Sequence, residues 1–113
     1  MKPALKKRLV DALQATQTAT DFCHGKNLEQ YRKDNLLRSG VERQLEILGE
    51  ALNRALTEEP GLETKIPEAR RIVGIRNRII HGYDSVDDEI LWEVVTTKLK
   101  PLAALLTELV AES

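Results

Sequence analysis

Residues 35–56, NLLRSGVERQLEILGEALNRAL, have the clearest helical pattern in the chain. Apolar residues recur there at every third or fourth position and form one stripe: Leu37, Val41, Leu45, Leu48, Leu52 and Ala55. Charged residues lie largely outside the stripe, so the pattern predicts an amphipathic helix that buries one face. Gly40 and Gly49 lie inside this helix, and each predicts a close contact with a neighbouring helix rather than a break.

On the N-terminal side of this stretch, the sequence predicts one further helix, over residues 3–24. Its apolar residues keep helical spacing, and Gly25 provides a stop. Residues 27–34 are mostly polar, which is typical of a connector that could hold one turn of helix.

On the C-terminal side, the sequence predicts two more helices. Pro67 suits the first turn of one helix, and Gly82 marks its expected end. Residues 85–88, Ser-Val-Asp-Asp, resemble a capping box with Asp in place of Glu, which would open a last helix that continues to the C-terminus. Pro101 should kink that last helix or split it in two.

The composition also favours packed helices. Aromatic residues make up only 4% of the chain, so the core must be built from Leu, Ile, Val and Ala. The 113 residues suffice for one domain, residues 1–113, with a single core, and they are few enough that an oligomer would help stability. The expected fold is an all-α, up-and-down bundle of four or five helices.

The overall charge and the cysteine content narrow the class of protein. The formal net charge of −1 argues against a protein that coats nucleic acid in bulk. Cys23 is the only cysteine, so there is no intrachain disulfide and no cysteine cluster for zinc. The chain starts with a charged amphipathic segment, and no apolar run approaches the length of a membrane span. These features predict a cytoplasmic protein.

Charges are unevenly placed in the second half of the chain. Residues 65–83 contain five cations against one anion, whereas residues 84–93 contain five acids and no base. The basic segment could bind phosphates, and the acidic segment could bind a basic partner. Two solvated helix faces of opposite sign would explain the pattern equally well.

Residues 76–83, RNRIIHGY, contain the side chains best suited to catalysis. Arg76 is a permanent cation and His81 titrates near neutral pH, and phosphodiester cleavage needs both kinds of group. A neutral His81 could take the proton from a ribose 2′-OH, and an imidazolium could protonate the leaving 5′ oxygen without any metal. Arg76 could stabilise the charge that develops on the phosphate oxygens. Asn77 could bind phosphate or orient the histidine, and Arg78 could steer RNA.

The two main catalytic candidates, Arg76 and His81, would point in different directions on one helix. Five residues of helix turn the chain by about 140°, so the side chains of Arg76 and His81 would diverge within one helix. They could converge if the helix ended near Gly82, or if a second copy supplied the other half of a shared site. A purely structural interpretation is also open. Arg76 could pair with Glu46 or Glu50, and His81 could interact with the last carbonyls of its helix.

Two blocks of the sequence resemble a known family. Residues 76–83 resemble the Arg-polar-x3-His-x-Tyr motif of HEPN-domain proteins. Residues 41–52 and 72–84 together are similar to the HepT toxins, the partners of MntA-type minimal nucleotidyltransferases. Trp92 stands where this family often has a tryptophan, and the resemblance covers nearly the whole chain.

The resemblance implies a HEPN-like homodimer in which both motifs line one interface cleft. It also implies a metal-independent endoribonuclease that cleaves tRNA or mRNA without a cofactor, as the toxin of a type VII HEPN/MNT toxin–antitoxin system. Arg76 and His81 would be catalytic, and Asn77 would be the polar helper. Tyr83 would be the tyrosine that the partner nucleotidyltransferase can AMPylate, which adds bulk and negative charge beside the site and silences the toxin.

Two other functions stay open at the level of sequence. The chain could be a non-catalytic nucleotide- or partner-binding subunit of a nucleotidyltransferase complex, in which Arg76 and His81 hold a phosphate without cutting. It could also be a helical adaptor whose acidic residues 84–93 dock a partner.

Overall fold

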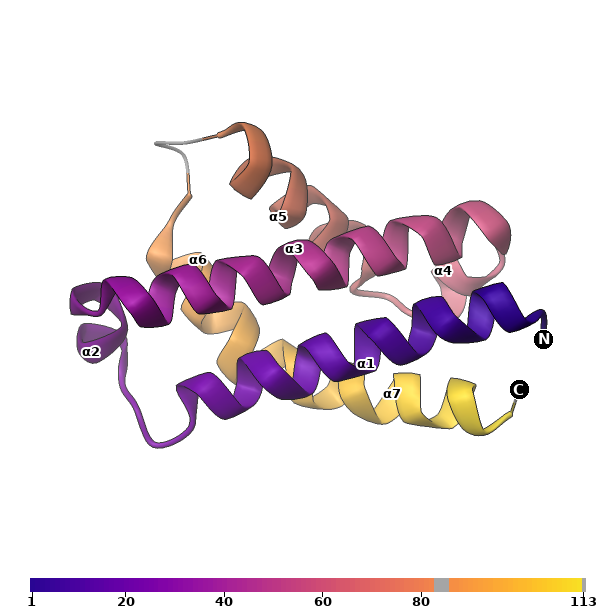
Figure 1. The fold of residues 1–113 in the computed structure, drawn as a ribbon, viewed down its shortest axis with the longest axis horizontal. Helices are drawn as coiled ribbons and strands as arrows, with labels where there is room; N and C mark the ends of the chain where they lie inside the picture. Colours follow the sequence, from indigo (N-terminus) through magenta and orange to yellow (C-terminus); the bar gives the residue numbers. More distant parts are fainter. Residues whose placement is uncertain (83–85, 113) are drawn as a thin grey trace.

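The computed structural model describes residues 1–82 and 86–112, and most of these residues are helical (Figure 1). The elements run in chain order as α1 (Pro3–Cys23), α2 (Leu28–Lys33), α3 (Asn35–Glu58), α4 (Leu62–Lys65), α5 (Ala69–His81), α6 (Asp88–Glu93), the π-helical segment η2 (Val94–Lys98) and α7 (Leu99–Ala111). The predicted all-α fold is therefore confirmed. Within the described residues, no helix combines the length and the apolar character that crossing a membrane requires.

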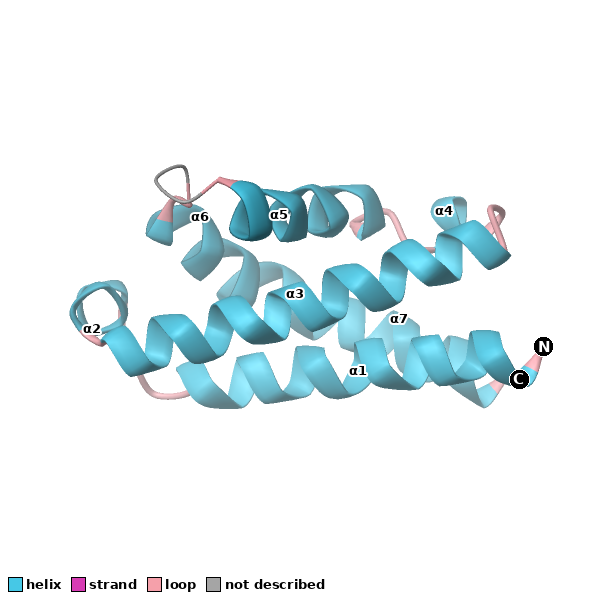
Figure 2. Ribbon diagram, turned by 45° about the horizontal axis from the view of Figure 1, so that its top comes forward, coloured by secondary structure: helices cyan, strands magenta, loops and turns pink. Residues whose placement is uncertain are grey.

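The helix α3 lies at the centre of the bundle. α1 packs along one side of α3 in the opposite direction, and α5 packs on another side (Figure 2). α7 lies against α1 and brings the described C-terminal residues back to the end of the molecule where the chain begins (Figure 1). The long helices thus alternate in direction, as expected for an up-and-down bundle.

One apolar core joins these helices. The stripe predicted for α3 faces this core, and Leu45, Leu48 and Leu52 are fully buried. Leu9 of α1 and Leu106 of α7 are also fully buried and belong to the same cluster. A buried leucine contributes about 1.5–3 kcal/mol relative to an exposed one, so this shared stripe fixes the position of α3.

The short helix α2 is better defined than the expected connector. The Asn27 side chain accepts a hydrogen bond from the Gln30 amide, and the Gln30 side chain accepts one from the Asn27 amide, which is a complete capping box. Tyr31 of α2 is fully buried and lies against Trp92 of α6, with ring centroids 5.5 Å apart. This aromatic contact ties α6 to α2.

Two elements between α3 and α5 differ from the prediction. The sequence does not predict α4, because a single turn from Leu62 to Lys65 is too short to show a helical period. α5 begins at Ala69, two residues after Pro67. The Ala69 amide bonds to the Ile66 carbonyl and closes a tight turn through Pro67, so the proline lies just ahead of the helix.

The prediction that a capping box over residues 85–88 opens the next helix is wrong about which residue forms the cap. The cap is Asp87, whose carboxylate accepts hydrogen bonds from the Glu89 and Ile90 amides, and α6 begins at Asp88. Ser85 lies outside the described residues. Neighbouring Ser and Asp residues are all good caps, so the sequence alone does not choose between them.

Pro101 coincides with a division of the C-terminal helix. It is the third residue of α7, just after the change of helical winding. The preceding segment η2 has the wider π-helical winding, and the Leu99 amide bonds to the carbonyl of Val94, five residues earlier. The chain therefore passes from α6 to α7 through a change of helical winding instead of a loop.

Candidate active site

The helix α5 positions the predicted site residues against α3. Its buried residues Ile72, Val73 and Ile75 face the core, and α5 makes its main contact with α3. The helix ends where expected, because the Gly82 amide bonds to the Arg78 carbonyl at 2.6 Å and closes the last turn. The spacing on α5 then brings Arg76 to the side that faces α3.

Gly49 allows α3 and α5 to approach closely beneath Arg76. A Cβ atom at position 49 would lie 2.4 Å from the Arg76 Cβ and 3.2 Å from the Ile72 carbonyl oxygen. Real Cβ atoms do not come as close as 2.4 Å, so only glycine fits this contact. The close helix contact predicted for Gly49 is confirmed, and it places the stem of Arg76 directly on the backbone of α3.

The Arg76 guanidinium is held by two partners. Its Nη2 lies 2.7 Å from the Glu50 Oε2, and its Nη1 donates to the Asn77 Oδ1 at 2.9 Å. Its Nε is buried without a hydrogen-bond partner among the described residues, and 26% of the side chain is exposed. The pairing predicted as the structural alternative is therefore present, with Glu50 as the partner, whereas Glu46 pairs with Arg43.

Glu50 is shared between two arginines. Its second carboxylate oxygen accepts a hydrogen bond from the Arg54 Nε at 2.7 Å. The hydrogen bond from Arg54, followed by the charges of nearby arginines including Arg76, holds the pKa of Glu50 below its ordinary value. One carboxylate between two guanidinium groups leaves one positive charge in excess, so the group can still attract a phosphate.

A pocket of about 260 Å³ opens beside Arg76. Its charged lining consists of four arginines and three acids: Arg8, Arg43, Arg54, Arg76, Asp11, Glu46 and Glu50. The lining therefore has one net positive charge. Arg8, Arg43 and Arg54 were not among the predicted site residues. The helical spacing of Arg43, Glu46, Glu50 and Arg54 along α3 is the signal that could have shown a common charged face.

His81 lies apart from the Arg76 pocket. It is the last residue of α5, it is exposed, and it does not line this pocket. Its side chain makes no hydrogen bond or ion pair with any residue in the described ranges 1–82 and 86–112. The structure thus brings Arg76 and Asn77 together and leaves His81 about 140° further round the helix. The remaining candidate, Tyr83, lies outside the described residues.

A comparison with models of protein families shows the family to which the chain belongs. A family model described as "Ribonuclease HepT-like" matches residues 12–109, which extend from α1 into α7. The chain belongs to the HepT-like family. The resemblance of the two sequence blocks to HepT proteins of the HEPN superfamily is therefore confirmed.

Two relatives of this HepT-like chain are similar over most of their length. A protein of Thermococcus cleftensis named "Probable ribonuclease HepT" is 30% identical over 102 residues, which cover 90% of this chain and 92% of the relative. A protein of Caldanaerobacter subterraneus subsp. tengcongensis named "Putative RNase TTE0752" is 30% identical over 97 residues, or 86% of each chain. No solved structure gives a significant match.

In this HepT-like chain, three cations of the basic segment 65–83 form ion pairs on α5, one of them with the acidic segment 84–93. Arg71 of α5 pairs with Glu93 of α6 at 2.8 Å, and Arg70 pairs with Glu63 at 3.0 Å. Arg78 differs from both, because its side chain has no hydrogen bond or ion pair within the part of the chain that the structure describes. Most of the basic segment therefore forms surface ion pairs, and Arg78 is its freest cation on α5.

Proposed function

We propose that this HepT-like chain is a metal-independent endoribonuclease that cleaves RNA through Arg76 and His81. The observation that carries the proposal is the Arg76 guanidinium, which Glu50 and Asn77 hold at the edge of an arginine-lined pocket on the helix that carries the family motif. Family membership and the printed names of the relatives support ribonuclease chemistry. A preorganised guanidinium matches the oxygens of a phosphate and its transition state.

The proposed reaction balances without a metal or a cofactor. A neutral His81 takes the proton of the ribose 2′-OH, and the 2′ oxygen forms a bond to phosphorus. The bond from phosphorus to the 5′ oxygen breaks, and an imidazolium donates the proton that this oxygen needs. The products are a 2′,3′-cyclic phosphate and a 5′-hydroxyl end. Arg76 stabilises the oxygens that gain charge on the way, while Asn77 keeps the guanidinium in place.

We further propose that the active site is composite. The separation of about 140° between Arg76 and His81 on α5 prevents both side chains from reaching one phosphate within a single straight helix. A homodimer about a two-fold axis would bring His81 of one copy to Arg76 of the other and would create two equivalent sites. In each site, one His81 could take the proton of the 2′-OH and then, as the imidazolium, donate it to the leaving 5′ oxygen.

We expect the purified protein to cleave single-stranded RNA in the presence of EDTA, because no step of the proposed reaction uses a metal ion. Gel analysis with end-group assays should show fragments with 2′,3′-cyclic phosphate and 5′-hydroxyl ends. The same oligonucleotide with 2′-O-methyl groups should stay intact, because it lacks the attacking hydroxyl. Cleavage that requires Mg²⁺, or equal cleavage of the 2′-O-methyl strand, would contradict the mechanism. Separate assays on tRNA and mRNA would identify the substrate.

We also propose that the protein is a cytoplasmic toxin controlled by a partner nucleotidyltransferase that AMPylates Tyr83. The position of Tyr83, two residues after His81, supports this role, since an adenylyl group there would compete with RNA phosphate. Incubation with the cognate nucleotidyltransferase and ATP should add an adenylyl group to the Tyr83 peptide in mass spectrometry and stop RNA cleavage. The Tyr83→Phe variant should escape both effects. Full inhibition of that variant would exclude Tyr83 as the control point.

One observation favours a second candidate function. The Arg76 pocket excludes His81, so in a single copy it could hold a phosphate without cutting it. In that case the chain would be a non-catalytic nucleotide-binding subunit of a nucleotidyltransferase complex. Nucleotide binding that depends on Arg76, together with no RNA turnover by the wild type, would support this function over the ribonuclease.

A further inference from the structure

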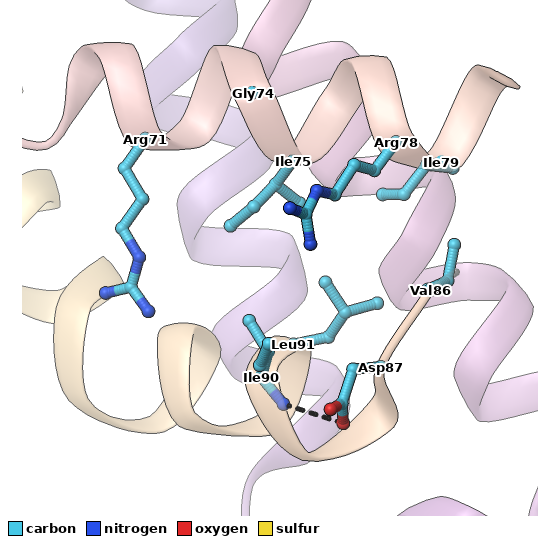
Figure 3. Close-up of a pocket in the computed structure, with 9 residues that line it drawn as sticks. All are labelled: Arg71, Gly74, Ile75, Arg78, Ile79, Val86, Asp87, Ile90 and Leu91. Atoms are coloured by element: carbon cyan, nitrogen blue, oxygen red, sulfur yellow. Dashed lines mark hydrogen bonds between the residues drawn. The ribbon is translucent and has the colours of Figure 1, made fainter. Parts of the chain in front are cut away.

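A second pocket of about 320 Å³ lies between α5 and α6 (Figure 3). The residues that line it include Arg71, Gly74 and Arg78 of α5, and none of its lining residues lines the Arg76 pocket. Its volume falls in the range of small-molecule sites in proteins. Arg78 and Ile79 belong to the motif block 76–83, but no group that lines this pocket takes part in the proposed cleavage reaction.

The walls of the second pocket are aliphatic. Ile75 and Ile79 of α5 face Ile90 and Leu91 of α6 across it (Figure 3). Ile90 is 39% exposed, so part of this wall is open to water. The pocket therefore offers two apolar walls to a flat ligand, and binding there would remove Ile90 from water.

Gly74 keeps the pocket open on the α5 side. A Cβ atom at position 74 would meet nothing within 4 Å, in contrast to Gly49. The helix α5 therefore has bare backbone midway between Arg71 and Arg78, where any larger residue would project into the space. Glycine in a helix interior lowers the stability of the helix. No close contact requires a glycine at position 74, so packing does not explain why this destabilising residue is there.

Arg78 supplies the free positive charge of the pocket. Its guanidinium extends over the space between the two helices (Figure 3). The other three arginines of α5 each pair with a carboxylate, namely Glu63, Glu93 and Glu50. Arg78 has no such partner among the described residues. A guanidinium without a carboxylate partner can bind a phosphate with two parallel hydrogen bonds, or stack on a base.

The two other charged groups that line the pocket are already engaged. Arg71, two helical turns or about 10 Å from Arg78, is bonded to Glu93 at 2.8 Å. The Asp87 carboxylate accepts the amide hydrogens at the start of α6. The pocket thus combines an apolar slot with one available cation at one end.

We propose that this pocket binds one unstacked nucleotide, with its base between the aliphatic walls and its phosphate on Arg78. The inference rests on the proposed ribonuclease function when the nucleotide belongs to an RNA strand. Arg78 and His81 are three residues apart on α5 and are therefore neighbours on the helix surface, so a strand held here would pass close to His81. A base that has left its stack can be held between apolar side chains, and an arginine can bind the phosphate of the same nucleotide. The nucleotide could come from RNA or from a free mononucleotide.

The test measures binding separately from cleavage. The probe is a fluorescent single-stranded RNA of about 12 nucleotides with 2′-O-methyl groups throughout, which the proposed reaction cannot cut. By fluorescence anisotropy, Arg78→Ala and Gly74→Leu should each raise the Kd about tenfold, through loss of a charged hydrogen bond and through filling of the slot. Arg70→Gln is the matched control, because Arg70 also lies on α5 but pairs with Glu63 away from the pocket. Its Kd should equal that of the wild type.

Further measurements separate the possible outcomes. Thermal melting should show that Gly74→Leu is folded, since leucine favours a helix more than glycine and meets open space. Displacement of the probe by AMP, with the same dependence on Gly74 and Arg78, would indicate a free nucleotide as a ligand. Unchanged Kd and KM in both folded variants, with RNA still cleaved, would overturn the pocket and leave the ribonuclease intact. Binding that needs Gly74 and Arg78 without any RNA cleavage would support the pocket and overturn the ribonuclease.

Discussion

Replacing His81 with alanine is expected to lower the rate of RNA cleavage at least about a hundredfold, the usual contribution of a general acid or base. The His81 side chain is exposed and makes no hydrogen bond to the described part of the chain, so the variant should fold like the wild type. Cleavage of a fluorescent RNA in EDTA measures the rate, and circular dichroism with thermal melting checks the fold. Undiminished cleavage by a folded His81→Ala protein would remove His81 from the mechanism.

His24 provides the matched control for this experiment. It is the only other histidine, it is exposed, and it lies at the end of α1, away from the α5 helix. His24→Ala should therefore cleave RNA at the wild-type rate. A similar loss in both variants would indicate that histidine removal acts through general stability.

Mixing two inactive variants tests whether the site is composite. If Arg76 and His81 act across a dimer, a mixed dimer of Arg76→Ala and His81→Ala chains has one complete site and one empty site. Random mixing makes half of the dimers mixed, so about a quarter of the wild-type activity should return. A site built within one copy predicts no recovery at all. The experiment requires subunit exchange, which native mass spectrometry of the mixture can verify.

The second large effect is expected for Gly49→Ala. The new Cβ would lie 2.4 Å from the Arg76 Cβ and close to the backbone of α5, so the helices must move apart. Such overpacking typically costs about 1–3 kcal/mol of unfolding free energy. A displacement of Arg76 by about 1 Å should also lower the cleavage rate up to about a hundredfold. Urea unfolding and the cleavage assay measure the two effects.

Gly74→Ala is the matched control for stability. It makes the same change in α5, whereas Gly49→Ala makes it in α3, on the other side of the contact between these helices. Its Cβ meets nothing within 4 Å, so the substitution should raise the unfolding free energy by about 0.5–1 kcal/mol. Opposite signs for Gly49 and Gly74 would separate the close helix contact from helix propensity. A Gly49→Ala protein as stable and as active as the wild type would show that α5 can shift without consequence.

The long helices could be predicted from sequence because their apolar periods extend over several turns. The stripe from Leu37 to Ala55 gave α3 its buried face, and Gly25 marked the end of α1 within two residues. The one-turn helix α4 and the register of the α6 cap could not be predicted. A single turn shows no period, and adjacent Ser and Asp residues offer several caps of similar strength.

Only part of the candidate site could be predicted from the sequence. Periodicity places Arg76 in line with Ile72 and Ile80, which indicates a side chain that faces another helix. The choice of Glu50 over Glu46 depends on how α5 settles on Gly49, and that depends on packing between distant segments. The pocket between α5 and α6 depends on the relative placement of two helices, which local spacing does not encode. The homodimer and the role of Tyr83 stay predictions.

The contacts of Arg76 with Glu50 and Asn77 have a thermodynamic consequence for substrate binding. A free arginine side chain would lose rotamer entropy, up to about 2 kcal/mol, on being fixed by a ligand. The Arg76 side chain is already ordered before RNA arrives, because its stem lies on Gly49 and its guanidinium is bonded at both ends. An incoming phosphate therefore exchanges one anionic partner for another without having to immobilise the arginine. Since Arg54 stays bonded to Glu50, the displaced carboxylate keeps a cationic partner during the exchange.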